Sequence, residues 1–71
     1  MTNTERLLKH IKNSGLKLQF IADKCGMSRS SLNNKIYNRT EFKTGEIEAL
    51  CVLLGISSIA ERHKVFFWSE S

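Results

Sequence analysis

The stretch from residue 18 to residue 38, LQFIADKCGMSRSSLNNKIYN, constrains the fold of this chain most strongly. Each half has apolar residues on one helical face: Ile21, Ala22 and Cys25 in the first half, Leu32 and Ile36 in the second. Between the halves, Gly26 suits a tight turn that needs a positive φ. Ser28 is a favoured N-cap residue for the helix that follows. The stretch therefore predicts two short helices, over residues 18–25 and 29–36, joined by a tight turn.

The outer face of the second of these helices is rich in serine and asparagine. Its residues are Arg29, Ser30, Asn33 and Asn34, with Ser31 at the edge. Ser and Asn are poor helix formers, because their side chains compete for backbone hydrogen bonds, so a function would explain such a row. Arg can bind guanine edges, Asn can bind adenine edges, and Ser is adaptable. The pattern predicts a helix-turn-helix whose second helix reads bases in the DNA major groove, with a solvated polar face as the alternative.

Charge is distributed unevenly along the chain. Nine Lys and Arg residues against three acids leave residues 1–45 at +6, and two bases against four acids leave residues 46–71 at −2, which together give the net charge of +4. A basic N-terminal region suits an anionic partner such as double-stranded DNA. A basic surface without a partner is the alternative that charge alone leaves open.

Capping signals predict two further helices, one before and one after the central pair. Thr2 with Glu5 fits a capping box, and Gly15 suits the end of the helix that follows. Later, Thr44 is expected to cap a strongly apolar helix that ends at Gly55. The apolar spacing of both segments indicates that each helix turns one face to a common core.

The C-terminal segment begins with another capping box, from Ser58 to Glu61, which predicts a fifth helix from about Ile59. An apolar tail follows: Val65, Phe66, Phe67 and Trp68. Part of this tail must cover the core of so small a protein, and any exposed remainder would mark a protein interface. A fully packed tail and a dimer or partner surface both stay open.

At 71 residues, the chain predicts a single all-α domain over residues 1–71, a compact bundle of about five short helices. Cys25 and Cys51 lie on apolar faces without metal-ligand spacing, so we expect free thiols in a reducing cytoplasm, with no metal and no cofactor. His10 and His63 are expected at the surface. No apolar run reaches the roughly 20 residues of a membrane span, and the N-terminus has no secretory pattern.

Catalytic constellations are missing from the sequence. It contains no Ser/His/Asp, Cys/His, paired-carboxylate or phosphate-loop arrangement, and a chain of this size offers little room for a deep pocket. We therefore expect neither an enzyme nor a small-molecule substrate.

Residues 18–36 resemble the helix-turn-helix of the phage Cro and repressor family. The matching residues are Ile21 and Ala22 in the first helix, Gly26 and Met27 in the turn, Ser28 as cap and Leu32 in the second helix, and Gly55 and Ile56 match the end of the family's fourth helix. The resemblance implies a lambda-repressor-like bundle that binds operator DNA as a homodimer. It also implies base contacts and phosphate contacts. The implied base contacts are Arg29, Ser30 and Asn34, with Asn33 nearby; the candidate phosphate contacts are Lys17, Gln19, Lys35, Asn38, Arg39 and Lys43.

Two departures from the family pattern affect the expected DNA contacts, and a second function stays open because of Leu18, the acidic C-terminal third and the apolar tail. Leu18 stands where the family often has a Gln that contacts the DNA backbone, and Lys35 stands where the family prefers an apolar residue. The first hypothesis is a small Cro-like phage or prophage transcriptional regulator in the cytoplasm of a bacterial host. The alternative is a modulator or antirepressor that binds a partner repressor protein, with residues 65–68 as the candidate interface.

Overall fold

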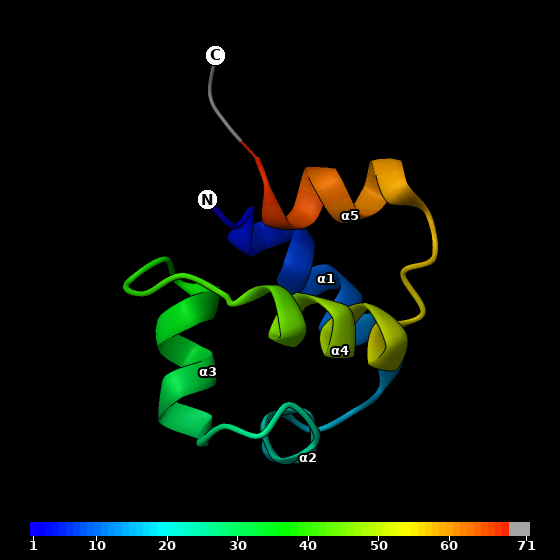
Figure 1. Ribbon diagram of the computed structural model, residues 1–71. Helices are drawn as coiled ribbons and strands as arrows, with labels where there is room; N and C mark the ends of the chain where they lie inside the picture. The colour runs from blue at the N-terminus through cyan, green and yellow to red at the C-terminus, as the bar shows by residue number, and fades with distance from the viewer. Residues whose placement is uncertain (69–71) are drawn as a thin grey trace.

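Five α-helices make up the computed structural model, which describes residues 1–68. The helices are α1 (Thr4–Ser14), α2 (Leu18–Lys24), α3 (Arg29–Ile36), α4 (Thr44–Leu54) and α5 (Ile59–Phe66). In the view of Figure 1, α1 and α4 lie between α5 at the top and α2 at the bottom, and α3 runs along one side. Residues 1–68 contain no β-strand, which confirms the predicted all-α class. None of the described helices has the length and apolarity needed to cross a membrane.

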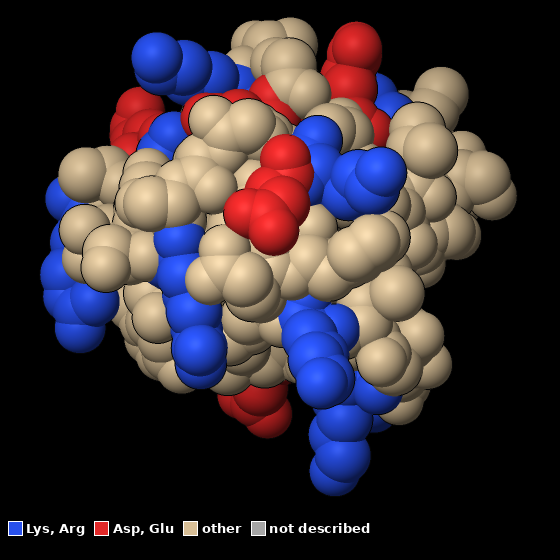
Figure 2. Space-filling view, turned by 90° about the horizontal axis from the view of Figure 1, so that it is seen from below, with Lys and Arg blue, Asp and Glu red and all other residues tan. Residues whose placement is uncertain are grey.

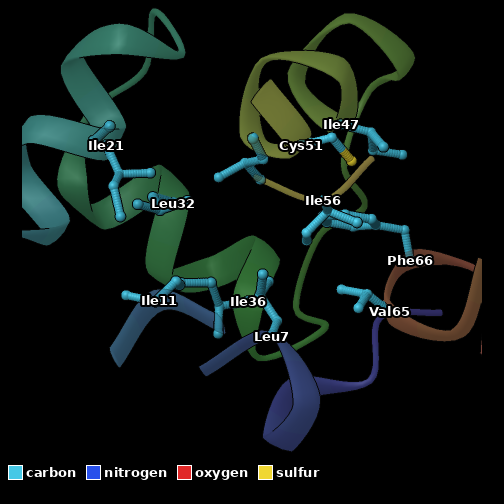
Figure 3. Packing of buried hydrophobic residues seen from close by; sticks show 12 residues of the cluster. Leu7, Ile11, Ile21, Leu32, Ile36, Ile47, Cys51, Ile56, Val65 and Phe66 are labelled. Atoms are coloured by element: carbon cyan, nitrogen blue, oxygen red, sulfur yellow. The ribbon is translucent and has the colours of Figure 1, made fainter. Parts of the chain in front are cut away.

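All five helices and the α4–α5 connection contribute to a single apolar core (Figure 3). The buried residues are Leu7, Ile11, Ile21, Ala22, Leu32, Ile36, Ile47, Leu50, Cys51, Ile56, Val65 and Phe66. Most of them occupy the apolar helical faces that the sequence predicts. Burial of these side chains is the main force that holds such short helices together, because helices of this length are marginal in isolation.

The predicted caps of α3 and α5 are confirmed. The Ser28 hydroxyl accepts a hydrogen bond from the Ser31 N–H at 3.1 Å, at the start of α3. The Ser58 hydroxyl accepts from the Glu61 N–H at 3.2 Å, at the start of α5. Each bond satisfies one of the backbone donors that the first turn of a helix leaves free.

The predicted caps of α1 and α4 are wrong by one residue. Asn3, not Thr2, caps α1, and its side-chain oxygen accepts a first-turn N–H at 3.1 Å. Thr44 is already the first residue of α4, and the Glu46 carboxylate accepts the N–H of the preceding Lys43 at 2.8 Å. In both places the residue next to the expected one takes the position at the helix end.

All three predicted glycine positions are confirmed, including Gly15, which ends α1 with φ +71. Gly26 has φ +72 between α2 and α3, and the Met27 N–H donates to the Ala22 carbonyl at 3.0 Å. At the end of α4, Gly55 has φ +70 and the Ile56 N–H donates to the carbonyl of residue 51 at 2.8 Å. This second bond pattern is that of a Schellman ending, and it returns Ile56 to the core.

The apolar tail divides between core and surface. Val65 and Phe66 are buried, and the Phe66 ring meets the Phe42 ring edge to face with centroids 5.5 Å apart. Phe67 is 52% exposed. Trp68 is half-buried, and its N–H donates to the Met1 carbonyl at 3.0 Å. The tail was expected either to pack fully or to form an interface. Residues 65 and 66 are packed in the core, whereas residue 67 exposes an apolar ring at the surface.

Candidate nucleic-acid interface

Helix α3 packs against α2 and α1, and Arg29 and Ser30 at its start are left exposed. The side chains of Ile21 and Ala22 on α2 and Leu32 on α3 are fully buried, and the two helices pack directly against each other. Figure 3 shows Ile21 and Leu32 pointing toward each other from the two helices. Ala22 has little side-chain bulk, which permits the close approach of α3. The packing therefore fixes how α3 presents its polar residues.

The first turn of α3 is the part that projects most freely. Arg29 and Ser30 are exposed directly after the cap residue Ser28. Asn33 and Asn34, further along the helix, are half-buried. Of the residues predicted to contact bases, the structure therefore offers two to the solvent and partly covers the other two. An exposed Arg at a helix N-terminus also adds to the positive end of the helix dipole.

Asn34 is engaged with the loop that follows α3. Its backbone carbonyl accepts the Arg39 N–H at 2.8 Å, and its side-chain oxygen accepts from the Arg39 guanidinium at 3.3 Å. The guanidinium also lies 5.7 Å from the centroid of the exposed Tyr37 ring. These contacts hold Arg39, a candidate phosphate contact, against the C-terminal half of α3.

Lys17, Arg39 and Lys43 are exposed, as a phosphate contact requires. Lys17 directly precedes α2, and Lys43 directly precedes α4. Figure 2 views the molecule from the α2 side, where Lys and Arg side chains stand out at several places around a central acidic side chain. Gln19 is exposed too, but its amide donates to the Asp23 carboxylate at 2.9 Å.

Lys35 has a different environment from the one that a phosphate contact needs. Its residue is only 8% exposed, and its amine lies 2.6 and 2.8 Å from the two carboxylate oxygens of Glu46. Burial raises the pKa of Glu46, but hydrogen bonds from the Lys35 amine and the Lys43 N–H outweigh it and leave the pKa below its usual value. The Lys35 amine is thus paired with a carboxylate of the protein itself. This environment does not fit the predicted contact of Lys35 with a DNA phosphate.

Asn38 is likewise committed to a contact within the protein. It has a left-handed backbone, with φ 64, in the turn after α3. Its side-chain oxygen accepts the Thr2 N–H and its amide donates to the Thr2 carbonyl, both at 2.9 Å. The structure therefore uses this side chain to hold the segment before α1, rather than leaving it free for DNA.

A charged cluster joins α1 to α5, and it was not predicted from the sequence. The Arg6 guanidinium donates two hydrogen bonds to Glu61, at 2.6 and 2.8 Å, and His10 Nε2 lies 2.8 Å from the same carboxylate. These bonds, the Arg6 bond above all, lower the pKa of Glu61 to about 2. His10 is half-buried here rather than on the open surface where we expected it. The available signal was the i, i+4 spacing of Arg6 and His10, which puts both on one helical face.

Cys25 and Cys51 are free thiols, and burial, with a smaller effect of the Glu46 charge, raises the pKa of Cys25. Within residues 1–68, no three His, Cys, Asp or Glu side chains are grouped so that they could hold a metal ion.

No family model, curated protein or solved structure matches this chain. Function is therefore inferred from the residues and geometry of this surface.

Proposed function

We propose that this chain is a small transcriptional regulator that binds operator DNA, with α2 and α3 as a helix-turn-helix and α3 in the major groove. The observation that carries the proposal is the free first turn of α3, where Arg29 and Ser30 are exposed while α2 packs behind the helix. In such motifs the N-terminal residues of the second helix contact base edges. Arg29 would bind guanine. The Ser30 hydroxyl, which can both donate and accept a hydrogen bond, would not be restricted to one base.

The distribution of charge supports DNA as the partner. Lys17, Arg39 and Lys43 are exposed, and each lies just before or just after one of α2, α3 and α4. Residues 1–45 carry a net +6, which favours a polyanion. By its resemblance to Cro proteins, the regulator would belong to a phage or prophage and act in the cytoplasm of its bacterial host. The proposal assigns no catalytic role to any residue.

Selection of binding sites from random duplex DNA, followed by titration of the selected site and of random DNA at several salt concentrations, tests this function. The wild-type protein is expected to prefer the selected site, and its affinity for both DNAs should fall as salt rises, because phosphate contacts release counterions. Equal affinity for selected and random DNA would refute sequence-specific binding.

Two variants separate base reading from phosphate binding. Arg29→Ala should lower the preference for the selected site by about 5- to 150-fold, the equivalent of about 1–3 kcal/mol for a lost base contact. Lys43→Ala should weaken binding to both DNAs equally and lower the salt slope by about 0.9. Lys64→Ala removes the same charge from α5, at the opposite end of the molecule from α2 in Figure 1, and should change neither quantity. An equal loss on both DNAs for Arg29→Ala would exclude base reading by that residue.

Two exposed apolar residues at the two ends of α5, Ile59 and Phe67, here called the α5 strip, favour a second candidate function, a modulator that binds a partner repressor. Ile59 is 84% exposed and Phe67 is 52% exposed, and they lie two helical turns apart with His63 between them. Exposed apolar residues that share a face often mark a protein interface. The same strip would serve a homodimer of the DNA-binding form.

Two point substitutions test this strip better than deletion of the tail, because Phe66 is part of the core. The double variant Ile59→Ser with Phe67→Ser should fold, since both side chains are exposed. In a homodimer it shifts sedimentation from dimer to monomer; in a modulator it abolishes nuclease-resistant capture of a repressor from the host. Wild-type behaviour in both measurements would exclude α5 as the interface.

A further inference from the structure

One carboxylate joins α3 to the start of α4. Glu46 Oε1 and Oε2 accept from the Lys35 amine on α3, at 2.6 and 2.8 Å, and Oε1 also accepts the Lys43 N–H at 2.8 Å. The Lys35 and Glu46 side chains are only 10% and 16% exposed. The Lys43 carbonyl is held as well, because it accepts the Ile47 N–H at 3.0 Å. The backbone of residue 43 is therefore tied to α3 through two largely covered side chains.

Lys43 itself is exposed at this anchored position. Its side chain is exposed, and its backbone is extended, with φ −81 and ψ 155. A long flexible lysine binds a phosphate well only if its point of attachment is fixed relative to the rest of the interface, since ordering the side chain costs entropy. The bond to Glu46 supplies this fixed point, and Lys35 sets it relative to the helix that carries Arg29.

We infer that Lys35 and Glu46 are positioning residues, which hold Lys43 at a DNA phosphate while the opposite side of α3 meets the bases. This inference rests on the proposed DNA-binding function. A buried ion pair stabilises a fold only weakly against an apolar pair of similar size, because both charges lose their water. Positioning of Lys43 gives this pair a function that stability alone does not.

The double variant Lys35→Met with Glu46→Gln tests the inference. It removes the tie between α3 and residue 43, leaves no unpaired buried charge, and keeps the net charge of the chain. The Gln oxygen can still accept the Lys43 N–H, so the start of α4 is preserved. A matched control is Arg6→Met with Glu61→Gln, which removes the Arg6–Glu61 ion pair between α1 and α5, also at constant net charge.

The measured quantity is the slope of log affinity against log salt on the selected DNA site. We expect the Lys35/Glu46 double variant to lose about 0.9 of this slope, the loss of one phosphate contact and the same loss as in Lys43→Ala. Adding Lys43→Ala to the double variant should cause no further loss. The Arg6/Glu61 control should keep the wild-type slope. A wild-type slope in the Lys35/Glu46 variant, or additive losses in the triple variant, would overturn the inference.

A second measurement does not depend on DNA. Backbone order parameters of residues 39–43, obtained by NMR relaxation without DNA, should fall in the Lys35/Glu46 variant and stay unchanged in the Arg6/Glu61 control. If circular dichroism shows that the double variant is unfolded, Lys35→Leu with Glu46→Gln, also without an unpaired buried charge and at constant net charge, is used for both comparisons. Unchanged order parameters would overturn the positioning role by themselves. Lowered order parameters in a protein whose wild type binds no DNA would refute the proposed function and the phosphate contact with it.

Discussion

The side chain of Asn38 forms a pair of hydrogen bonds with the backbone of Thr2, accepting its N–H and donating to its carbonyl, both at 2.9 Å. This pairing imitates the exchange of bonds between two strands, although 36 residues separate the partners. Two further bonds hold the same segment to the other end of the chain, from Asn3 to Val65 at 2.7 Å and from Trp68 to Met1 at 3.0 Å. The segment before α1 is thus fastened between the turn after α3 and the end of α5.

Substitution of Asn38 should separate the contribution of its side chain from that of its backbone. Asn38→Gly keeps the left-handed backbone but loses both bonds to Thr2, and should lower the free energy of unfolding by about 1–3 kcal/mol, at about 0.5–1.5 kcal/mol for each hydrogen bond. Asn38→Ala should lower it by about 1–2 kcal/mol more, because a Cβ is disfavoured at positive φ. Urea denaturation of both variants shows which of them is the less stable. Equal stability of the two variants would contradict the left-handed conformation.

Two glycines should respond in opposite directions to the same substitution. Gly26 has φ +72, whereas Gly45 lies in the first turn of α4, and a Cβ added at either position meets no atom within 4 Å. The preferred backbone conformation of alanine therefore decides whether each substitution raises or lowers the stability. Gly26→Ala should therefore destabilise the protein by about 1–2 kcal/mol, and Gly45→Ala should stabilise it by about 0.5–1 kcal/mol. Thermal unfolding compares the two, and a stabilising Gly26→Ala would show that the turn has another conformation.

The features that could be predicted from sequence are those set by neighbouring residues. Gly26 and Ser28 determine the turn and the cap of α3 through their own backbone and side-chain chemistry, and the structure confirms both. The apolar spacing of Leu32 and Ile36 identified the buried face of α3 for the same reason. Conformation encoded over a few residues can be read without knowing the fold.

Features that depend on a distant partner could not be predicted in this way. A lysine on a polar helix normally lies at the surface, so nothing local distinguishes Lys35 until α4 brings Glu46 to it. Thr2 and Asn3 are both good cap residues, and the fold favours Asn3 because Thr2 is held by Asn38. The same limit applies to the candidate interface, where tertiary contacts decide which polar side chains are free.

The pH dependence of stability should contain a contribution from Glu61. Its pKa is about 2 in the folded protein, against an ordinary value of 4.5. Because the folded-state pKa is the lower one, this contribution is fully present above about pH 4.5 and is lost as the pH falls toward 2. Glu61→Gln should therefore cost stability at pH 6 and almost none at pH 2.

Denaturant unfolding at a series of pH values checks this dependence. The loss in Glu61→Gln at neutral pH should be on the order of 1 kcal/mol, because the Arg6 side chain is 43% exposed and solvent screens the pair. Glu48→Gln, at an exposed position on α4, is the matched control and should change stability by less than about 0.5 kcal/mol. A loss in Glu61→Gln that is the same at pH 2 and pH 6 would contradict the assignment.

Asn34 and Arg39 should act on DNA as one unit rather than as separate contacts. The Asn34 side-chain oxygen accepts from the Arg39 guanidinium, so Asn34→Ala releases a residue that is expected to bind a phosphate. Asn34→Ala should then weaken binding to selected and random DNA alike, and it should add little to Arg39→Ala in the double variant. A direct contact between Asn34 and an adenine would instead reduce the preference for the selected site, by about 1–3 kcal/mol, and would add to the effect of Arg39→Ala. Titration of the two single variants and the double variant on both DNAs distinguishes these outcomes.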